Sequence, residues 1–199
     1  MCGESNTMPI LGEPAPDFEA LTTNGIVKLS DFKGKWLVLF SHPADFTPVC
    51  TTEFIAFSAI ADELKSLNVQ LMGLSIDSVH SHLAWIRNVK EKMGVDIPFP
   101  IIADLDMNVA KKYGMIHPGQ SSTAAIRAVF FIDDKGILRA MIYYPLTAGR
   151  YMPEIIRLVK SLQATDKYGV ATPANWQPGD KVVVPAPKNK AEMDKRLSE

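Results

Sequence analysis

Cys50 lies in a segment whose residue types fit thiol chemistry. The run Asp45-Phe-Thr-Pro-Val-Cys50 places this cysteine where a proline-rich loop meets a helix that we predict from about Thr51 to Leu67, where apolar residues recur three and four positions apart. The first backbone N–H groups of a helix have no partner within it and favour an anion. Because the thiolate is the nucleophilic form of cysteine, this position favours a reactive sulfur.

A helix terminus alone stabilises a thiolate too weakly. It contributes about 0.3–1 kcal/mol, or about 2 kcal/mol when partly buried, whereas a cation about 4 Å away contributes up to roughly 4 kcal/mol at intermediate dielectric. We therefore expect an arginine beside the sulfur. Arg127 is the candidate because it opens an apolar strand of the same predicted sheet, and its forked guanidinium can bind sulfur and a substrate oxygen together.

Thr47 and Pro43 complete this candidate site. Thr47 stands three residues before Cys50, so its hydroxyl can fold back over the sulfur and accept a hydrogen bond from a substrate. Pro43 would close the pocket and exclude water. The alternative is that Cys50 is only a small apolar side chain packed in the core, as free cysteines commonly are.

The remaining pattern predicts an α/β protein with one layered sheet. Residues 14–32 indicate a hairpin with an Asn24-Gly25 turn. Further strands are predicted at Trp36–Phe40, Val69–Ile76, Pro98–Asp104, Ala128–Ile132 and Ile137–Tyr144, and further helices at about 78–93, 107–113 and 152–164. This order resembles a thioredoxin-like fold with an N-terminal β-hairpin extension.

The composition changes after about residue 165. The segment 166–199 is rich in proline and contains one strand-like run, Lys181–Val184, before a charged and helical end. It is too small to bury a core of its own. We predict two parts: residues 1–165 form the thioredoxin-like domain, and residues 166–199 form a C-terminal arm that packs on that domain or on a partner subunit.

The site segment resembles a known family. Pro43, Thr47 and Cys50 form the pattern P-x-x-x-T-x-x-C, which continues as Thr51-Thr-Glu53. It resembles the active-site signature of the peroxiredoxins (the alkyl hydroperoxide reductase/thiol-specific antioxidant superfamily), in particular the one-cysteine class and its archaeal and bacterial relatives. Other matches, in order, are Phe40-Ser-His-Pro43, Leu74-Ser-Ile-Asp-Ser-Val79, His82-Leu-Ala-Trp85, Ile97-Pro-Phe-Pro-Ile-Ile102, Tyr143-Tyr-Pro145 and Gly149-Arg150.

The resemblance covers the chain from about Leu11 to Trp176 and implies an enzyme, a thiol-dependent peroxidase that reduces hydrogen peroxide and organic hydroperoxides. Cys50 would be oxidised to a sulfenic acid and then regenerated by an external thiol. Thr47 and Arg127 would activate the peroxide, and Pro43 would shield it. No metal, haem or flavin cofactor is implied.

The resemblance also implies supporting residues. Glu53 and Arg150 match an ion-pair network that holds the arginine in place, and His42 matches a histidine kept beside the proline. From the residues alone, Glu53 in a first helical turn can simply complement the helix dipole, and His42 can be a satisfied loop histidine. The pair His80 and His82 lacks further metal-ligand types nearby, so we expect exposed side chains and no metal site.

The two cysteines restrict how an oxidised Cys50 could be reduced. No cysteine follows Cys50, and there is no C-x-x-C pair of the kind a dithiol electron carrier needs. The expected reductant is therefore an outside thiol (thioredoxin, glutaredoxin, glutathione or a small thiol), with Cys2 as a further candidate for the resolving residue. The alternative function is an oligomeric holdase chaperone or a peroxide sensor that uses the same cysteine. The family resemblance implies a homodimer that assembles to a decamer.

Composition excludes several other classes. The chain has 199 residues and a net charge of −1, which argues against nucleic acid as a partner. No apolar run approaches the roughly 20 residues that span a bilayer, and the first residues lack the pattern of a secretory signal. We therefore expect a cytoplasmic protein with no membrane partner.

Overall fold

The computed structural model describes residues 8–198, with side chains described as far as Asp194. Cys2 lies outside the described residues. The chain divides into two compact units, one extending to Met152 and the other beginning at Pro153. In the described part no helix is both long enough and apolar enough to cross a membrane.

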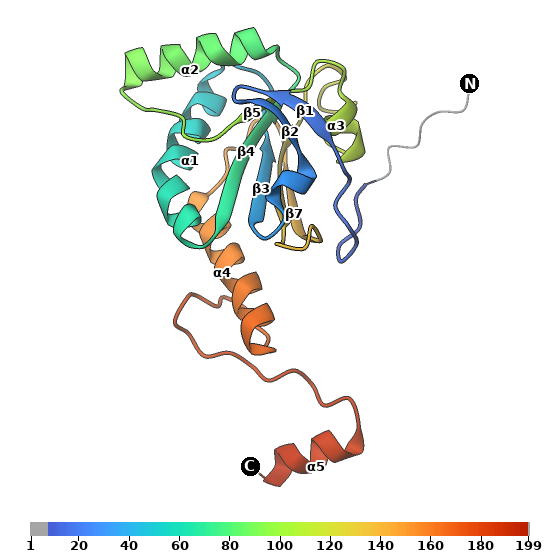
Figure 1. Cartoon of the computed structure of the whole chain (residues 1–199). Coiled ribbons are helices and arrows are strands. Elements are labelled where there is room, and N and C mark those ends of the chain that lie inside the picture. Colours follow the sequence, from blue (N-terminus) through green and yellow to red (C-terminus); the bar gives the residue numbers. More distant parts are fainter. Residues whose placement is uncertain (1–7, 199) are drawn as a thin grey trace, which may run out of the picture. The chain divides into compact units, whose positions relative to one another are not determined.

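A single mixed sheet organises the first unit (Figure 1). Its strand order is β2-β1-β5-β4-β3-β6-β7. The strands are β1 (Glu19–Thr22), β2 (Gly25–Lys28), β3 (Trp36–Ser41), β4 (Val69–Ser75), β5 (Ile101–Ala103), β6 (Arg127–Ile132) and β7 (Leu138–Tyr144). The central strands β5, β4 and β3 are parallel, whereas β6 runs antiparallel to β3 and β7 antiparallel to β6. With the β1–β2 hairpin at one edge, this is the α/β, thioredoxin-like architecture that the sequence predicts.

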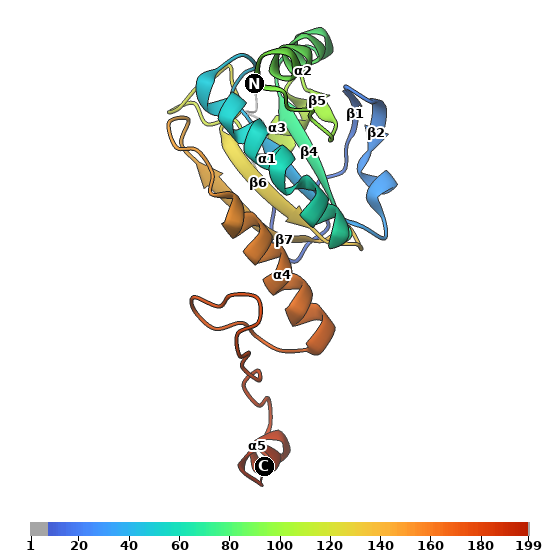
Figure 2. The ribbon, with the colours of Figure 1, turned by 90° about the vertical axis from the view of Figure 1, so that its left-hand side faces the viewer.

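Both faces of strand β3 are covered by other parts of the protein. All six of its residues are buried. Leu37 and Leu39 belong to the same apolar cluster as residues of the short helix α3 (Asn108–Lys112), whereas Phe40 stacks on Phe57 of helix α1 (Pro48–Ser66) with ring centroids 3.9 Å apart. Helix α1 therefore covers one face of the sheet and α3 the other, as the two views agree (Figures 1 and 2).

A glycine lets α1 approach the sheet closely. Gly73 of β4 pairs with Phe40 of β3. A Cβ atom on Gly73 would lie 3.1 Å from the Phe54 ring of α1 and 3.5 Å from the Phe40 ring. Contacts this short displace neighbouring atoms in a packed core, so the absence of a side chain at position 73 sets how deeply the helix that carries Cys50 is seated.

The remaining elements agree with the sequence pattern in type more than in extent. Helix α2 (Val79–Met93) begins at Ser78, whose side chain accepts the N–H of Ser81, and ends at Gly94 in the left-handed conformation (φ 68°). Helix α1 begins about three residues earlier than predicted, so Cys50 lies inside it. Helix α4 (Met152–Tyr168) is longer than predicted, and α5 (Lys190–Ser198) provides the expected helical end.

Two local predictions are wrong. The hairpin turn comprises residues 23 and 24, one residue earlier than predicted, because Gly25 (φ 100°) is already the first residue of β2 and pairs with Thr22. The predicted strand Lys181–Val184 does not form: one isolated bridge joins Val183 to Ala171, and Val182, Val183 and Val184 are exposed. Three consecutive valines favour a strand, but a strand needs a partner along its length.

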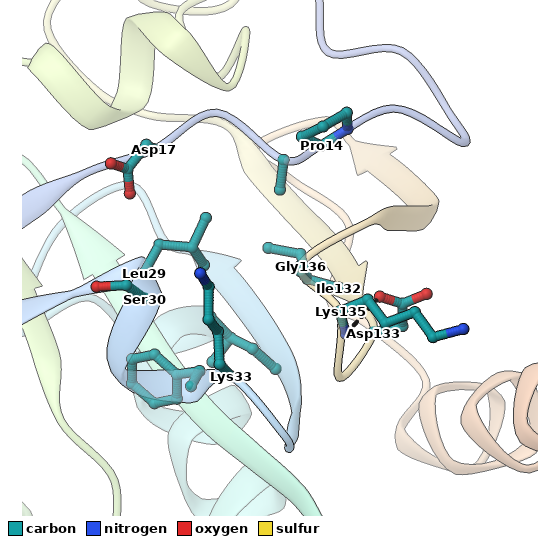
Figure 3. A pocket seen from close by; sticks show the side chains of 12 residues that line it. Pro14, Asp17, Leu29, Ser30, Lys33, Ile132, Asp133, Lys135 and Gly136 are labelled. Carbon is teal, nitrogen blue, oxygen red and sulfur yellow. Dashed lines mark hydrogen bonds between the residues drawn. The ribbon is translucent and has the colours of Figure 1, made fainter.

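A cavity of about 300 Å³ lies near the start of β3 (Figure 3). It is lined by Leu37 of β3, Ile132 at the end of β6 and polar residues that include Asp17, Lys33 and Asp133. Cys50 follows the opposite end of β3, after Ser41. The cavity is therefore at the other end of the sheet from the cysteine.

Candidate active site

Cys50 occupies the first turn of α1. Thr47 caps this helix in an extended conformation, Pro48 is the first helical residue, and Cys50 is the third. Pro48 has no backbone N–H. The N–H groups of Val49 and Cys50 lie in the first turn, where the helix itself provides no carbonyl to accept them. The Cys50 side chain is 0% exposed. Its sulfur is thus enclosed at the positive end of the helix dipole.

Arg127 contacts this sulfur, as the sequence analysis expected. It is the first residue of β6, the antiparallel neighbour of β3. Its Nη1 lies 3.3 Å from Cys50 Sγ and donates a 2.7 Å hydrogen bond to Glu53 Oε2, while Nε donates to the carbonyl of Leu146 at 2.9 Å. The arginine is 3% exposed. Several acceptors therefore hold one guanidinium in a fixed orientation against the sulfur.

Glu53 lies one helical turn after Cys50 and binds a second arginine. Arg150 donates to Glu53 Oε1 from Nε at 2.8 Å and from its backbone N–H at 2.9 Å, and to Oε2 from Nη2 at 2.6 Å. Burial by itself would raise the pKa of the Glu53 carboxyl, but the bonds and charges of Arg150 and Arg127 outweigh burial and hold that pKa below its ordinary value.

Arg150 also ties this carboxylate to the sheet. Its Nη1 donates to the carbonyl of Ser41 at the end of β3 and to that of Ala128 in β6, at 2.8 and 3.1 Å. The guanidinium lies 5.2 Å from the ring centroids of both Phe40 and Phe57. Burial lowers the pKa of Arg150, and the charge of Glu53 opposes that effect. Because Nε, Nη1 and Nη2 of Arg150 all donate hydrogen bonds, this buried side chain is the protonated guanidinium.

The buried charges balance only when the cysteine is ionised. Arg127 and Arg150 contribute two positive charges and Glu53 one negative charge, so the cluster carries an excess positive charge beside a neutral thiol. A thiolate at Cys50 makes the cluster neutral. An uncompensated buried charge is costly, so an anion bound beside these arginines would stabilise the cluster.

Thr47 and Pro43 lie in the loop that leads into α1. The Thr47 hydroxyl donates its only hydrogen to the carbonyl of Ala44 at 2.9 Å. Toward any other group this oxygen can therefore act only as an acceptor, which is the role expected of it at a substrate hydroxyl. Pro43 is partly buried in the same loop.

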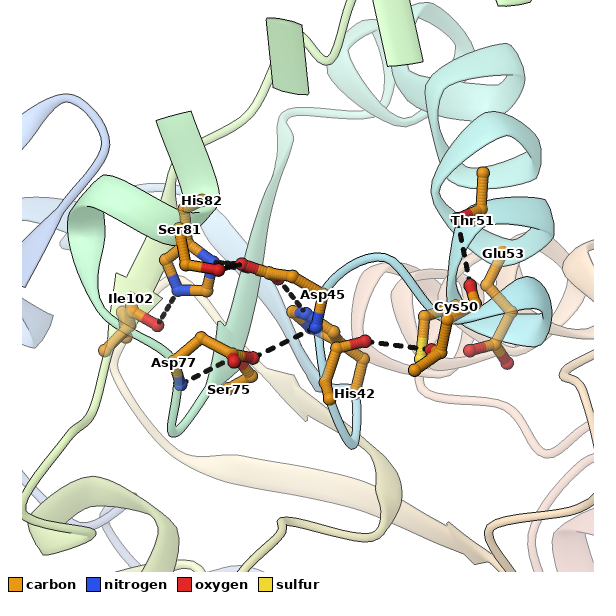
Figure 4. Close-up of polar contacts among 12 residues, drawn as sticks. His42, Asp45, Cys50, Thr51, Glu53, Ser75, Asp77, Ser81, His82 and Ile102 are labelled. Carbon is orange, nitrogen blue, oxygen red and sulfur yellow. Dashed lines mark hydrogen bonds and ion pairs between the residues drawn. The ribbon is translucent and has the colours of Figure 1, made fainter. Parts of the chain in front are cut away.

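His42 belongs to a second buried cluster in this loop (Figure 4). Its Nε2 lies 2.9 Å from Asp45 Oδ1, and Asp45 in turn contacts Nδ1 of His82 on α2 at 2.9–3.0 Å. His42 and His82 are both 0% exposed. The expectation of an exposed side chain is therefore correct for His80 and wrong for His82, because Asp45 supplies the acidic partner that seemed to be missing.

Asp45 and His82 are the polar residues that sequence reasoning overlooked. A signal was present: His82 lies on the same helical stripe as the buried residues Trp85 and Val89 of α2, three and seven positions later. The ligand-type atoms of His42, Asp45 and His82 lie within 4.8 Å of one another. Direct hydrogen bonds join His42 to Asp45 and Asp45 to His82, so the arrangement is that of a proton-sharing chain.

Comparison with known proteins agrees with this fold. Residues 11–141 match the model of the AhpC/TSA family, and residues 161–198 match the C-terminal domain of 1-Cys peroxiredoxin. A peroxiredoxin from Aquifex aeolicus is 62% identical over 97% of this chain and 92% of that protein, and one from Methanosarcina mazei is 52% identical over 96% and 90%.

Solved structures give the same result. A cysteine-to-serine mutant of the peroxiredoxin 6 of Arenicola marina superposes with a TM-score of 0.86 at 44% identity, covering 95% of this chain and 89% of that one. A yeast mitochondrial 1-Cys peroxiredoxin, described with glutathione and thioredoxin systems as its thiol-resolving mechanism, has a TM-score of 0.86 at 42% identity, covering 96% and 94%.

The chain belongs to the AhpC/TSA family of peroxiredoxins and carries a 1-Cys peroxiredoxin C-terminal domain. It is a thiol-dependent peroxidase with a thioredoxin-like fold.

Replacing Glu53 by Gln removes the single negative charge between the two buried guanidinium groups. We expect the free energy of unfolding at pH 7 to fall by about 3–5 kcal/mol, the usual cost of leaving a buried charge without its partner. Because the carboxyl pKa is lower in the folded protein than in the unfolded chain, the stabilisation is present above about pH 4.3 and is lost as the pH falls through the folded-state value. Urea unfolding of both proteins from pH 3 to pH 8 should therefore show a difference that shrinks on acidification.

Glu19→Gln is the matched control for this measurement. Glu19 pairs with Lys28 at 2.9 Å on the exposed β1–β2 hairpin, where water screens the charges. We expect its unfolding curves to follow those of the wild type at every pH. An E53Q protein as stable as the wild type at pH 7 would contradict the charge balance described above.

Proposed function

We propose that Cys50 is the peroxidatic residue and that this protein reduces hydrogen peroxide and organic hydroperoxides at its sulfur. The thiolate attacks the terminal oxygen of the hydroperoxide, so that an S–O bond forms as the O–O bond breaks. Sulfur is oxidised by two electrons to a sulfenic acid, and the departing alkoxide or hydroxide takes up one proton to leave as an alcohol or water.

The observation that carries this proposal is the contact between Arg127 Nη1 and Cys50 Sγ at 3.3 Å, made by an arginine that Glu53 also holds. A cation in this position can stabilise the thiolate and, in the transition state, the charge that develops on the peroxide oxygens. The first-turn N–H groups of α1, which have no acceptor within the helix, would be further donors, and the Thr47 oxygen would be an acceptor for the peroxide O–H.

The other residues would act around this centre. Pro43 would exclude water from the sulfur. Glu53 and Arg150 would hold Arg127, and the hydrogen bonds among the three side chains support this role. His42 would serve as a neutral polar group of the loop that leads into α1, since burial lowers its pKa. Catalysis would then depend on orientation of the peroxide as much as on ionisation of the thiol.

Replacing Cys50 by Ser should abolish consumption of peroxide, since a serine hydroxyl is neither ionised nor readily oxidised near neutral pH. For the wild-type protein, intact-mass analysis after one equivalent of hydrogen peroxide should show a gain of one oxygen. Peroxide consumption by C50S near the wild-type rate would overturn the assignment.

The same mass measurement separates two routes of reduction. We propose an external thiol (thioredoxin, glutaredoxin, glutathione or a small thiol) as the reductant, because Cys2 and Cys50 are the only cysteines of this sequence. The attacking thiol forms a mixed disulfide and releases water, and a second thiol then frees Cys50. Loss of two hydrogens with a dimeric band on a non-reducing gel would instead identify Cys2 as the resolving residue.

We also propose a division of labour along the chain: residues 1–165 carry the peroxidase site, and residues 166–199 form an arm that packs on the core or on a partner subunit. The exposed side chains of Val182, Val183 and Val184 support a role in packing, since apolar residues gathered on a small segment favour contact. A cytoplasmic location, as expected from the sequence, belongs to the same proposal.

We further propose a homodimer that assembles to a decamer, and two surfaces support it. Strand β7 is the last strand of the sheet order, and we propose its outer edge as the place where a second copy pairs. In addition, Phe46 of the loop before α1 and Leu83 of α2 are 56% and 48% exposed around one shallow hollow, which provides an apolar contact for another dimer.

The substitution Leu83→Asp tests the second surface. A charge in an apolar contact between dimers is desolvated without a partner, so we expect sedimentation velocity to show L83D as a dimer and the wild type as a decamer. Met93→Asp is the matched control because Met93 is also exposed on α2 and lies at its far end, outside the hollow. A wild-type protein that sediments as a dimer, or an L83D protein that remains decameric, would contradict this assembly.

A further inference from the structure

Both ring nitrogens of His82 face hydrogen-bond acceptors. Nε2 lies 3.1 Å from the carbonyl oxygen of Ile102, and Nδ1 lies 2.9 and 3.0 Å from the two carboxylate oxygens of Asp45. A carbonyl only accepts, so Nε2 must carry a proton. An ionised carboxylate also only accepts, so opposite such a group Nδ1 must carry one too.

The surroundings of Asp45 favour its ionised form. Its oxygens contact His42 Nε2 at 2.9 Å and accept the Ser81 hydroxyl at 2.8 Å, in addition to His82. Burial alone would raise the pKa of this carboxyl, but the bonds from His42 and His82 outweigh burial and hold the pKa well below its usual range. Asp77 is the other acidic group nearby, and it accepts the backbone N–H of Asp45 and the Ser75 hydroxyl.

An ionised Asp45 also dictates the tautomer of His42. His42 Nε2 faces the carboxylate and must donate to it, whereas Nδ1 is buried and has no hydrogen-bond partner among the described residues. A proton on Nδ1 would leave a buried donor unsatisfied and turn two lone pairs toward each other at Nε2. The bare nitrogen is therefore Nδ1, on the loop that leads to Cys50 (Figure 4).

We propose that His82 is a positioning residue of the peroxidase site, present as a buried imidazolium that keeps Asp45 ionised, so that Asp45 fixes His42 with its proton on Nε2 and a bare lone pair on Nδ1. The His82–Asp45 pair adds no net charge beside the thiolate cluster. By fixing the tautomer of His42, the pair makes Nδ1 of His42 a neutral, oriented acceptor. This nitrogen can accept a hydrogen bond from a small molecule that enters the site. The role of this acceptor rests on the proposed function, whereas the positions of the protons do not.

The positions of the protons can be observed in the full-length, reduced protein. The chain has four histidines, so ¹⁵N labelling of histidine and long-range ¹H–¹⁵N correlation spectra give one pattern for each ring. We expect His82 to carry protons on both nitrogens at pH 7 and His42 to carry one on Nε2 alone. His80, which is exposed, provides an internal reference for a ring outside the buried cluster.

Variants link this chain of bonds to the reaction. In His82→Gln the cation is lost while an amide donor remains, so we expect His42 to populate both tautomers and the rate constant for peroxide reduction to fall about ten-fold or more, as for loss of a charged hydrogen bond. His80→Gln, on the same helix but exposed, should change neither readout. If H82Q fails to fold, the wild-type spectra alone decide the positions of the protons.

Several results would overturn this proposal: a neutral His82, a proton on Nδ1 of His42, or an H82Q protein with an unchanged His42 pattern. A metal ion found in the purified protein, with no proton on His82 Nδ1, would also overturn it in favour of a metal site. Loss of the proposed function is distinguishable from all of these, because peroxidase activity in C50S would leave the histidine spectra as predicted.

Discussion

One buried carboxylate holds the reactive end of this fold together. Glu53, on the helix that carries Cys50, bonds to guanidinium groups from two other segments: Arg127 at the start of β6 and Arg150 after β7. Without this negative charge, two cations would face each other inside the protein at a cost of several kcal/mol. With it, a guanidinium stands 3.3 Å from the sulfur, and a thiolate completes the charge balance.

The packing of the sheet sets that geometry. Because Gly73 has no side chain, the rings of Phe54 and Phe40 can pack over it and α1 lies close to the sheet. The rings of Phe40 and Phe57 in turn pack against the guanidinium of Arg150. The guanidinium of Arg150 is thus placed by core packing and by carbonyls of the strands, and Glu53 joins it to the guanidinium of Arg127. A rigid support of this kind lets a charged donor stabilise a transition state without reorganising during the reaction.

Sequence alone predicted most of the elements, because these follow from local rules, and it predicted the central contact, because a thiolate at a helix start needs a cation. The apolar run of β3, the glycine stop of α2 and a cysteine at a helix start are all visible in short windows, and the need for a cation pointed to Arg127. The pair of Asp45 and His82 was missed because no chemical requirement like that of the thiolate pointed from one residue to the other, and they meet only through the tertiary fold. The valines at 182–184 failed as a strand because β-propensity does not supply a pairing partner.

The most direct measurement of the central claim is the second-order rate constant for hydrogen peroxide with reduced Arg127→Gln protein, followed by stopped-flow tryptophan fluorescence. Removal of an oriented charged donor should lower this constant by about 10²–10³-fold, and Arg127→Lys should recover little because an ammonium cannot reproduce the fork. Lys90→Gln, at an exposed position of α2 outside the hollow around Leu83, should react like the wild type. An R127Q protein that reduces peroxide at close to the wild-type rate would contradict the account.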